Sequence, residues 1–296
     1  MSEPVRMATD ASLVLISRDR CIACGSAGLS ELSGATFGDP PVRSFIESDP
    51  WGENPMPVLE SERWSFVQCD ECGQRFHGRI LSKEWNEIRF SRWMSEDAIR
   101  QFEAQHASGG TSAVAHVQHV LRLRDLGVRR VLDFGCGFGQ FLEMCRSFGI
   151  DAVGVDRSHA RRSGAGLQIF AELDDAPGQF DAVTLFEVLE HLDDPLAMIR
   201  LLRTRLNPRG VMIVEVPNTT GTVAISSRED YYKIHPLDHI NAFTPSTLAR
   251  MMDRAGFAPI NKRSAFVTTS LKRVAKDFAK ARLKQNSTQR YFRMKP

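Results

Sequence analysis

The sequence between residues 129 and 266 alternates short apolar runs with amphipathic stretches. The apolar runs are 129–134, 151–156, 166–170, 180–186, 211–217 and the region around Ala265. The amphipathic stretches lie at 139–149, near 159–164, at 195–207 and at 245–257. Apolar strands separated by helices indicate a parallel sheet with helices on both faces. We therefore expect a doubly wound α/β fold.

The segments outside this alternation have a different character. Residues 1–95 are rich in Gly, Pro and Ser and show poor periodicity, so we expect a loop-rich segment that needs a staple to hold it. Residues 96–128 have helical spacing with a break at ASGGTS, and residues 267–296 suggest a basic helical tail. The expected organisation is an N-terminal segment, a helical connector, an α/β domain at residues 129–266 and the tail.

Composition and charge limit the class of protein. The 42% hydrophobic and 25% charged content is that of an ordinary globular chain of 296 residues. No apolar run reaches the roughly 18–20 residues of a membrane span, and the first 20 residues lack an export signal, so we expect a cytoplasmic protein. From residue 262 to 295 there are 11 basic residues and one acid, Asp277. A solvated basic helix is the expected interpretation, because no aromatic platform for nucleic acid accompanies the charge.

A glycine loop follows the first apolar run of the α/β region. In VLDFGCGFGQF, Gly135, Gly137 and Gly139 allow a sharp turn and close approach of a ligand. A dinucleotide fingerprint requires Gly or Ala where Gln140 stands, so a pyrophosphate site is not indicated. Asp133 precedes the loop and favours a cationic ligand. Asp156 ends the second strand, where it can accept hydrogen bonds from ribose hydroxyls.

These residues resemble the class I S-adenosylmethionine-dependent methyltransferases, which have a Rossmann-like fold. The resemblance covers about residues 125–265 and includes the acid-x-GxGxG pattern, Asp156, the Phe-Asp pair at residues 180–181, FEVLEHLDDP and LNPRGVMIVEVPN. Arg209 stands where the family more commonly has a glycine. The resemblance implies a bound S-adenosylmethionine whose methionine part faces Asp133 and the glycines, whose ribose is held by Asp156, and whose adenine lies near Leu173 and Asp174. It also places Cys136 and Glu187 in the donor site.

Four of the six cysteines form two Cys-x-x-Cys-Gly pairs. Cys21 and Cys24 make one pair, and Cys69 and Cys72 make the other. Four thiolates in a tetrahedral array favour zinc. Disulfides are disfavoured in a reducing compartment, and neither pair has the helix-start context of a redox motif. We expect structural zinc. A zinc-binding N-terminal segment joined to this fold resembles bacterial enzymes that methylate nucleotide-linked sugars, in which that segment covers the substrate.

Two places offer groups for proton transfer. Glu190 and His191 follow the fourth strand, at the edge where open α/β sheets bind their ligands; they either act as bases or only fix the loop. The stretch YYKIHPLDHINAF follows the fifth strand. Because Pro236 favours an extended His235, we do not expect His235 and His239 to form a metal pair on one helix face. The resemblance implies that His239 binds or deprotonates the acceptor, and that Tyr231, Tyr232 and His235 lie where some sugar C-methyltransferases have a catalytic group.

The function predicted from the sequence is methyl transfer from S-adenosylmethionine to a small molecule, such as a nucleotide-linked sugar or another natural-product precursor. One alternative is methylation of RNA or protein, with the zinc segment and basic tail holding the polymer. A second alternative is a protein that binds S-adenosylmethionine without turnover. Nucleic acid is not the expected partner, and the sequence leaves a homo-oligomer open.

Overall fold

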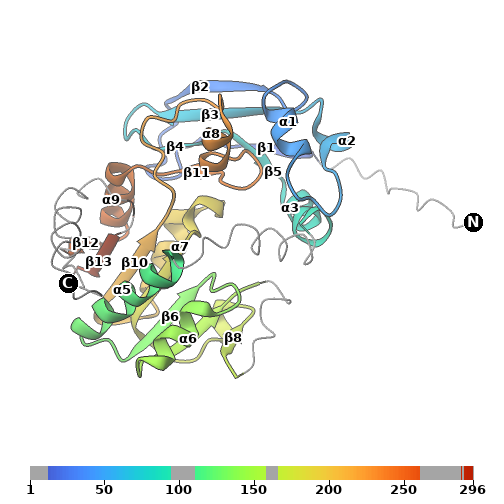
Figure 1. Ribbon diagram of the computed structural model, residues 1–296. Helices are drawn as coiled ribbons and strands as arrows, with labels where there is room; N and C mark the ends of the chain where they lie inside the picture. Colours follow the sequence, from blue (N-terminus) through green and yellow to red (C-terminus); the bar gives the residue numbers. More distant parts are fainter. Residues whose placement is uncertain (1–12, 95–110, 158–165, 261–287, 289, 296) are drawn as a thin grey trace, which may run out of the picture.

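The computed structural model describes residues 13–94, 111–157, 166–260, 288 and 290–295. In this part of the chain the N-terminal elements form a layer above a larger sheet, with strands β6, β8 and β10 in the lower half of Figure 1. The described helices are α1 (Val42–Glu47), α2 (Met56–Leu59), α3 (Lys83–Ile88), α5 (Thr111–Asp125), α6 (Gln140–Ser147), α7 (Pro195–Arg203), α8 (Arg228–Lys233) and α9 (Pro245–Arg254). A π-helical turn (Arg89–Trp93) and two 3-10 turns, η3 (Leu173–Asp175) and η4 (Leu189–His191), complete the described helical elements.

The larger sheet has seven strands in the order β12-β13-β10-β9-β6-β7-β8. The five strands from β10 to β8 are parallel. They are β6 (Arg130–Phe134), β7 (Asp151–Val155), β8 (Gln168–Phe170), β9 (Phe180–Phe186) and β10 (Leu206–Glu215). The strand order reverses between β6 and β9, and open α/β sheets bind ligands at such a switch point, beyond the carboxyl ends of the strands. The predicted doubly wound fold is confirmed.

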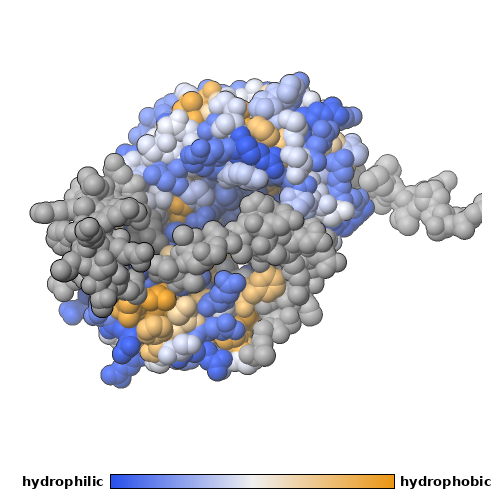
Figure 2. All heavy atoms as spheres, viewed as in Figure 1, coloured by the Kyte–Doolittle hydropathy of each residue, from blue (hydrophilic) through white to orange (hydrophobic). Residues whose placement is uncertain are grey.

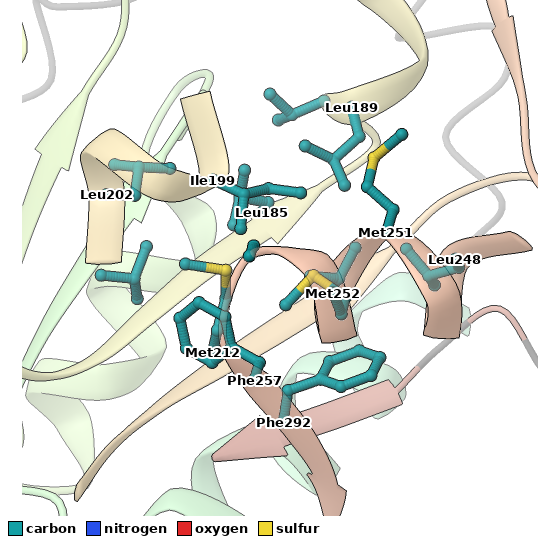
Figure 3. Close-up of a cluster of buried hydrophobic side chains, with 14 of the residues drawn as sticks. Leu185, Leu189, Ile199, Leu202, Met212, Leu248, Met251, Met252, Phe257 and Phe292 are labelled. Atoms are coloured by element: carbon teal, nitrogen blue, oxygen red, sulfur yellow. The ribbon is translucent and has the colours of Figure 1, made fainter. Parts of the chain in front are cut away.

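Both faces of this sheet are buried, as the continuous apolar runs predict. Leu132, Val183 and Met212 pack with α7 and α9 on one face, and Figure 3 shows their neighbours Ile199, Leu202 and Met252 meeting above the strands. Val131 and Ala182 pack with α5 and α6 on the other face. Successive residues of a strand point to opposite faces, so each strand contributes to two cores.

Strand β13 (Arg290–Met294) corrects the expectation of a helical tail. It lies between β10 and β12 (Phe257–Ile260) and is antiparallel to both. Tyr291 and Phe292 are fully buried in the cores on opposite faces of the sheet. Arg290 and Arg293 flank this pair, and their charge hides the two-residue alternation of the strand. The predicted amphipathic stretch at 269–285 lies outside the described residues.

Three further expectations need adjustment or lie outside the description. Helix α9 ends at Arg254, and Gly256 has a φ of 86°, so Phe257 begins strand β12 instead of ending the helix. The predicted strand near Ala265 and the helices expected near residues 159–164 and 96–106 fall on residues that are not described. Of the predicted connector, α5 begins at Thr111, within the expected break.

The N-terminal segment is more regular than its composition suggests. Strands β2 (Leu29–Thr36), β3 (Arg63–Cys69) and β4 (Arg75–His77) form an antiparallel sheet, while β1 (Leu15–Ser17) pairs with β5 (Arg79–Leu81). β2 is an edge strand whose side chains are half-buried or exposed, and its pairing has a register shift between Glu31 and Ser33. A half-buried edge strand has weak alternation, which explains why the sequence predicted mainly loops.

The fourth strand of this N-terminal sheet comes from the distant segment 217–243. Strand β11 (Asn241–Ala242) pairs with β4, opposite Phe76 and Arg75. The same segment contributes Ile225, Tyr231, Ile234 and Leu237 to a core that also contains Phe37, Leu59, Trp64 and Phe66. The N-terminal sheet is therefore held over the segment that follows β10.

The surface is mainly polar on the face seen in Figure 2. Hydrophilic residues cover much of the upper, N-terminal part, and hydrophobic residues gather in the lower part, over the larger sheet. Among the described residues, no helix is long and apolar enough to span a bilayer.

Candidate functional site

The glycine loop joins β6 to α6 at the switch point of the larger sheet. Gly135, Gly137 and Gly139 all have positive φ angles, between 56° and 82°. A Cβ on Gly135 would lie 2.6 Å from Val188 Cγ2, whereas a Cβ on Gly137 would meet no atom within 4 Å. The loop therefore packs tightly against the turn after β9 on one side and leaves open space at its middle. That open space is what a ligand at the loop requires.

Two carboxylates flank this loop, as the sequence predicted. Asp156, at the end of β7, accepts a hydrogen bond from the Gly137 amide at 2.9 Å. Asp133 is buried and accepts one from the Thr184 hydroxyl at 2.6 Å. Burial raises the pKa of Asp133 to about 7, and the nearby Asp156 carboxylate adds to the effect. Two acids at one loop, one of them poorly solvated, favour a ligand that brings positive charge.

The remaining residues predicted for the donor site differ in their burial and contacts. Cys136 is buried in the loop, its Sγ 2.5 Å from where a Cβ on Gly154 would lie. Leu173 and Asp174 form the η3 turn after β8; Leu173 packs into the core and Asp174 is exposed. Glu187 follows β9 with a φ of 53°, and its amide donates to the Glu215 carbonyl at 2.9 Å. Its backbone conformation is one that non-glycine residues seldom adopt.

Glu190 lies in the η4 turn, directly after the segment that packs on the glycine loop. Its side chain is 1% exposed, and neither carboxylate oxygen makes a hydrogen bond of good geometry within the described residues. Burial raises the pKa of Glu190 well above its usual value, and the Glu187 carboxylate adds to this. Burial without a hydrogen-bond donor or counter-charge thus favours the neutral carboxyl form of Glu190, and a bound cation would be needed to hold it ionised.

His191 and His239 lie next to that carboxylate. The His191 Nε2 is 4.0 Å from Glu190 Oε1, and the two imidazole rings are 4.9 Å apart between centroids. One ligand atom each from Glu190, His191 and His239 can be chosen so that all lie within 4.8 Å of one another. The three residues are far apart in sequence, and together we call them the Glu-His-His cluster.

The neighbours of the two histidines fix how each ring is oriented. His191 Nδ1 lies 3.0 Å from both the backbone oxygen and the Oδ1 of Asp238, so Nδ1 faces two acceptors and Nε2 is the nitrogen directed toward Glu190. Burial lowers the pKa of His239 to about 3, with His191 adding to the effect. His239 Nδ1 has no hydrogen-bond partner among the described residues. A His239 ring with so low a pKa is a poor general base, and its neutral nitrogen is a suitable metal ligand.

Asp238 and Arg89 support this cluster and were not anticipated. Arg89 is buried and forms an ion pair with Asp238. Although burial opposes it, His191 and Arg89 hold the pKa of Asp238 well below its usual value, so this carboxylate stays ionised. Asp238 stands beside His239 in the sequence, and that adjacency was the one available signal. Nothing in the sequence around Arg89 indicated a role.

His235 and the tyrosines lie elsewhere. Tyr231 donates to Asp49 Oδ2 at 2.5 Å and lies 2.7 Å from His235 Nε2, while the Leu237 amide donates to His235 Nδ1. Arg228 donates to the same Asp49 at 2.6 Å. Tyr232, on the same helix, is 39% exposed. The structure thus separates His235 from His239, as Pro236 suggested, and brings His239 to His191 instead.

The four cysteines of the two pairs form a second cluster. Cys21 Sγ lies 3.5 Å from Cys72 Sγ, Cys24 Sγ lies 3.5 Å from Cys69 Sγ, and all four sulfurs are within 4.8 Å of one another. Gly25 and Gly73 follow the two pairs with φ angles of 76° and 70°, which lets each turn direct both sulfurs to one point. The donor set and its compactness fit a tetrahedral zinc ion. Cys136 and Cys145 belong to a different core.

Comparison with known proteins agrees with this geometry. A profile of the methyltransferase-domain family matches residues 86–262. The ubiquinone biosynthesis O-methyltransferase of Dinoroseobacter shibae is 33% identical over 153 residues, covering 45% of this chain and 62% of that protein. The enzyme of the same name from Azorhizobium caulinodans is 35% identical over 166 residues, covering 49% and 65%. The chain therefore spans a little under two thirds of the length of these relatives.

Solved structures give similar matches at lower identity. A methyltransferase from Archaeoglobus fulgidus, described as dependent on S-adenosylmethionine (SAM), has 24% identity and a TM-score of 0.44, covering 67% of this chain and 99% of that one. The plantazolicin methyltransferase BpumL, solved with S-adenosylhomocysteine (SAH), has 15% identity and a TM-score of 0.48, covering 71% and 94%.

The Tyr231 network generates a stability prediction. Tyr231→Phe removes a buried hydroxyl that contacts Asp49 and His235, and should lower the free energy of unfolding by about 1–3 kcal/mol. The matched control is Tyr232→Phe, on the exposed side of the same helix, which should change it by about 0.5 kcal/mol or less. Both are measured by denaturant unfolding. Equal stabilities for the two variants would contradict a structural role for the network.

Proposed function

We propose that this chain, which belongs to the methyltransferase family and has the fold of its class I S-adenosylmethionine-dependent members, transfers a methyl group from S-adenosylmethionine to a hydroxyl oxygen of a small molecule. The observation that carries the proposal is the position of the Glu-His-His cluster. Val188 packs on Gly135, so the turn that holds Glu190 and His191 lies against the glycine loop. The glycine loop proposed to bind the cationic donor and the Glu-His-His cluster proposed to activate the acceptor therefore lie at the same edge of the sheet.

The residues around the loop fit the donor. S-adenosylmethionine, when bound, supplies an electrophilic methyl group on a sulfonium. The open space at Gly137 leaves room for donor atoms close to the backbone of the loop, and Asp156 is placed to accept hydrogen bonds from ribose hydroxyls. Asp133 lies behind the loop, where its charge favours the ammonium and sulfonium groups. Cys136, Leu173, Asp174 and Glu187 complete the proposed donor site.

The acceptor side requires removal of a proton, because a neutral hydroxyl is a weak nucleophile. We infer that Glu190, His191 and His239 perform this together by holding a divalent cation. Such a cation would lower the pKa of a bound hydroxyl, whose proton would then pass to solvent water. The chain's own contribution is the geometry: Asp238 orients His191, burial keeps His239 neutral, and the buried carboxyl group of Glu190, whose pKa is raised by burial and by Glu187, would ionise on binding a cation. This proposal assigns no part in the step to His235 and Tyr232, because they are not members of the cluster.

The names of the relatives support oxygen as the methylated atom. The curated relatives are named for O-methylation in ubiquinone biosynthesis, which supports a small-molecule acceptor. A sugar in nucleotide-linked form remains the other acceptor class, since the N-terminal layer resembles a substrate cover. Cys21, Cys24, Cys69 and Cys72 are proposed to bind structural zinc, which would hold the β3–β4 hairpin and the residue 20–25 turn together.

The donor site is tested by binding. Asp156→Ala should weaken binding of S-adenosylhomocysteine by about 10- to 100-fold, because hydrogen bonds to a charged group contribute about 1.5–3 kcal/mol. Isothermal calorimetry measures the affinity, and circular dichroism checks the fold. The control is Asp125→Ala, an exposed acid at the end of α5. Unchanged affinity in Asp156→Ala would remove this residue from the donor site.

The cation site is tested on protein from which metal has been stripped and zinc restored at one equivalent. Calorimetric titration with Mn²⁺ should show one further site, whose affinity falls about tenfold or more in Glu190→Gln and His239→Ala. Zinc content should stay unchanged in both variants. With an acceptor in hand, His239→Ala should reduce turnover more than donor affinity. A titration in which the wild-type protein takes up no Mn²⁺ would remove the cation from the proposal and leave the cluster as proton-transfer groups only.

Zinc at the cysteine cluster is tested by metal analysis. We expect about one zinc per chain for four thiolates, and loss of zinc with lower thermal stability in Cys24→Ser. The control Cys145→Ala, in the core between α6 and the sheet, should retain the metal. A zinc-free preparation with the same melting temperature as the native protein would refute the structural role.

A further inference from the structure

Asn241 connects the two halves of the Glu-His-His cluster. It is 1% exposed, and it lies in β11, two residues after His239. Its Nδ2 donates to the Leu189 carbonyl at 2.9 Å and to the Leu192 carbonyl at 2.6 Å. These two carbonyls stand on either side of Glu190 and His191. One amide group therefore fixes the segment that carries His239 and β11 to both ends of the turn that carries Glu190 and His191.

Arg18 makes the same connection from the N-terminal segment. Its Nη1 donates to Asn241 Oδ1 at 2.9 Å, and its Nη2 donates to the Asp193 carbonyl at 2.5 Å. Weaker contacts reach the Ile240 and Leu192 carbonyls, at 3.4 and 3.5 Å. The side chain lies over the Phe76 ring, and its backbone amide donates to Gly78. Both hydrogens of the Asn241 amide and its oxygen are thus engaged.

The strand that carries Asn241 is held by the cysteine hairpin as well. Gln74, two residues after Cys72, donates from Nε2 to the Ala242 carbonyl at 2.8 Å. The His77 amide donates to the Ile240 carbonyl at 2.9 Å. Arg18 itself stands three residues before Cys21. Short stretches of chain and direct hydrogen bonds therefore connect the two cysteine turns to Arg18 and Asn241, the two residues that contact the turn of the cluster.

We propose that Arg18 and Asn241 are positioning residues that set the distance of His239 from Glu190 and His191, so that the N-terminal segment assembles the acceptor-activating cluster in addition to covering it. This rests on the proposed function for its chemical meaning. Neither residue contacts the reacting atoms. The planar fork of Arg18 reaches an amide oxygen and a carbonyl at once, which a lysine ammonium cannot reproduce. An aspartate at position 241 would replace the donating amide with a carboxylate oxygen, so that two acceptors, this oxygen and a backbone carbonyl of the turn, would face each other.

The experiment compares Asn241→Asp, Asn241→Ala and Arg18→Lys with the control Arg75→Lys. Arg75 also joins the N-terminal sheet to the 217–243 segment, through Gln68 and the Thr222 carbonyl, but does not contact the η4 turn. The first readout is the contact between the His191 and His239 rings, followed by NMR on protein labelled at histidine. The second is the affinity for Mn²⁺ of zinc-restored protein. Binding of S-adenosylhomocysteine, zinc content and melting temperature are measured alongside.

We expect the inter-ring contact to be lost, and Mn²⁺ affinity to fall about 10- to 100-fold, in the Asn241 and Arg18 variants. Affinity for S-adenosylhomocysteine should stay within about twofold and zinc content should be unchanged. Arg75→Lys should lower the melting temperature without changing either cluster readout. Retention of the ring contact in Asn241→Ala, whatever its melting temperature, would overturn the positioning role. Loss of the contact in a protein whose native form takes up no Mn²⁺ would keep the positioning role and remove only the cation from the proposed function.

Discussion

The pairing of β11 with β4 is the contact on which the rest of the structure depends. It covers only Asn241 and Ala242, yet it joins the segment after β10 to the N-terminal sheet. The 217–243 segment leaves the larger sheet and returns to it at α9, and ordering such a long excursion costs considerable conformational entropy. Burial of Ile225, Tyr231 and Ile234 among N-terminal apolar residues offsets that cost. The two layers therefore stabilise each other, and neither core is complete without residues of the other layer.

Buried charge follows the same seam between the layers. Asp49 has Arg228 and the Tyr231 hydroxyl, and Asp238 has Arg89 and His191. In both cases a carboxylate on one layer meets a cation or a donor from the other, so its desolvation is compensated by a contact between layers. Glu190 differs from these acids, because its side chain is only 1% exposed, against 9% for Asp49 and 27% for Asp238, and it makes no such contact within the described residues. That difference is the physical reason for assigning it a ligand.

The elements that were predicted from the sequence are those with a clear signal in a short stretch of residues. The five parallel strands and the glycine loop were evident, because a strand buried on both faces is a continuous apolar run and because Gly135 needs a positive φ. The cysteine pairs were equally clear from spacing. Strand β13 was not, because only Tyr291 and Phe292 are fully buried in it and basic residues surround them. The N-terminal sheet was missed because β2 is half-exposed and its fourth strand is about 165 residues further along the chain.

The candidate site illustrates the limit of sequence reasoning most clearly in the two histidines four residues apart. Pro236 predicted that His235 and His239 do not share a helix face, and helix α8 ends at Lys233, before both. That local pattern carried no information on which residues from other parts of the chain would lie next to His239. A metal site needs converging lone pairs and an uncompensated charge, and these can come from any part of the chain. His239 meets Glu190 and His191 because β11 registers with β4 and because Asn241 bridges to η4. The arrangement thus depends on contacts that only the folded chain provides. The same contacts determine why His235 lies by Asp49 whereas His239 lies by the buried carboxyl group of Glu190.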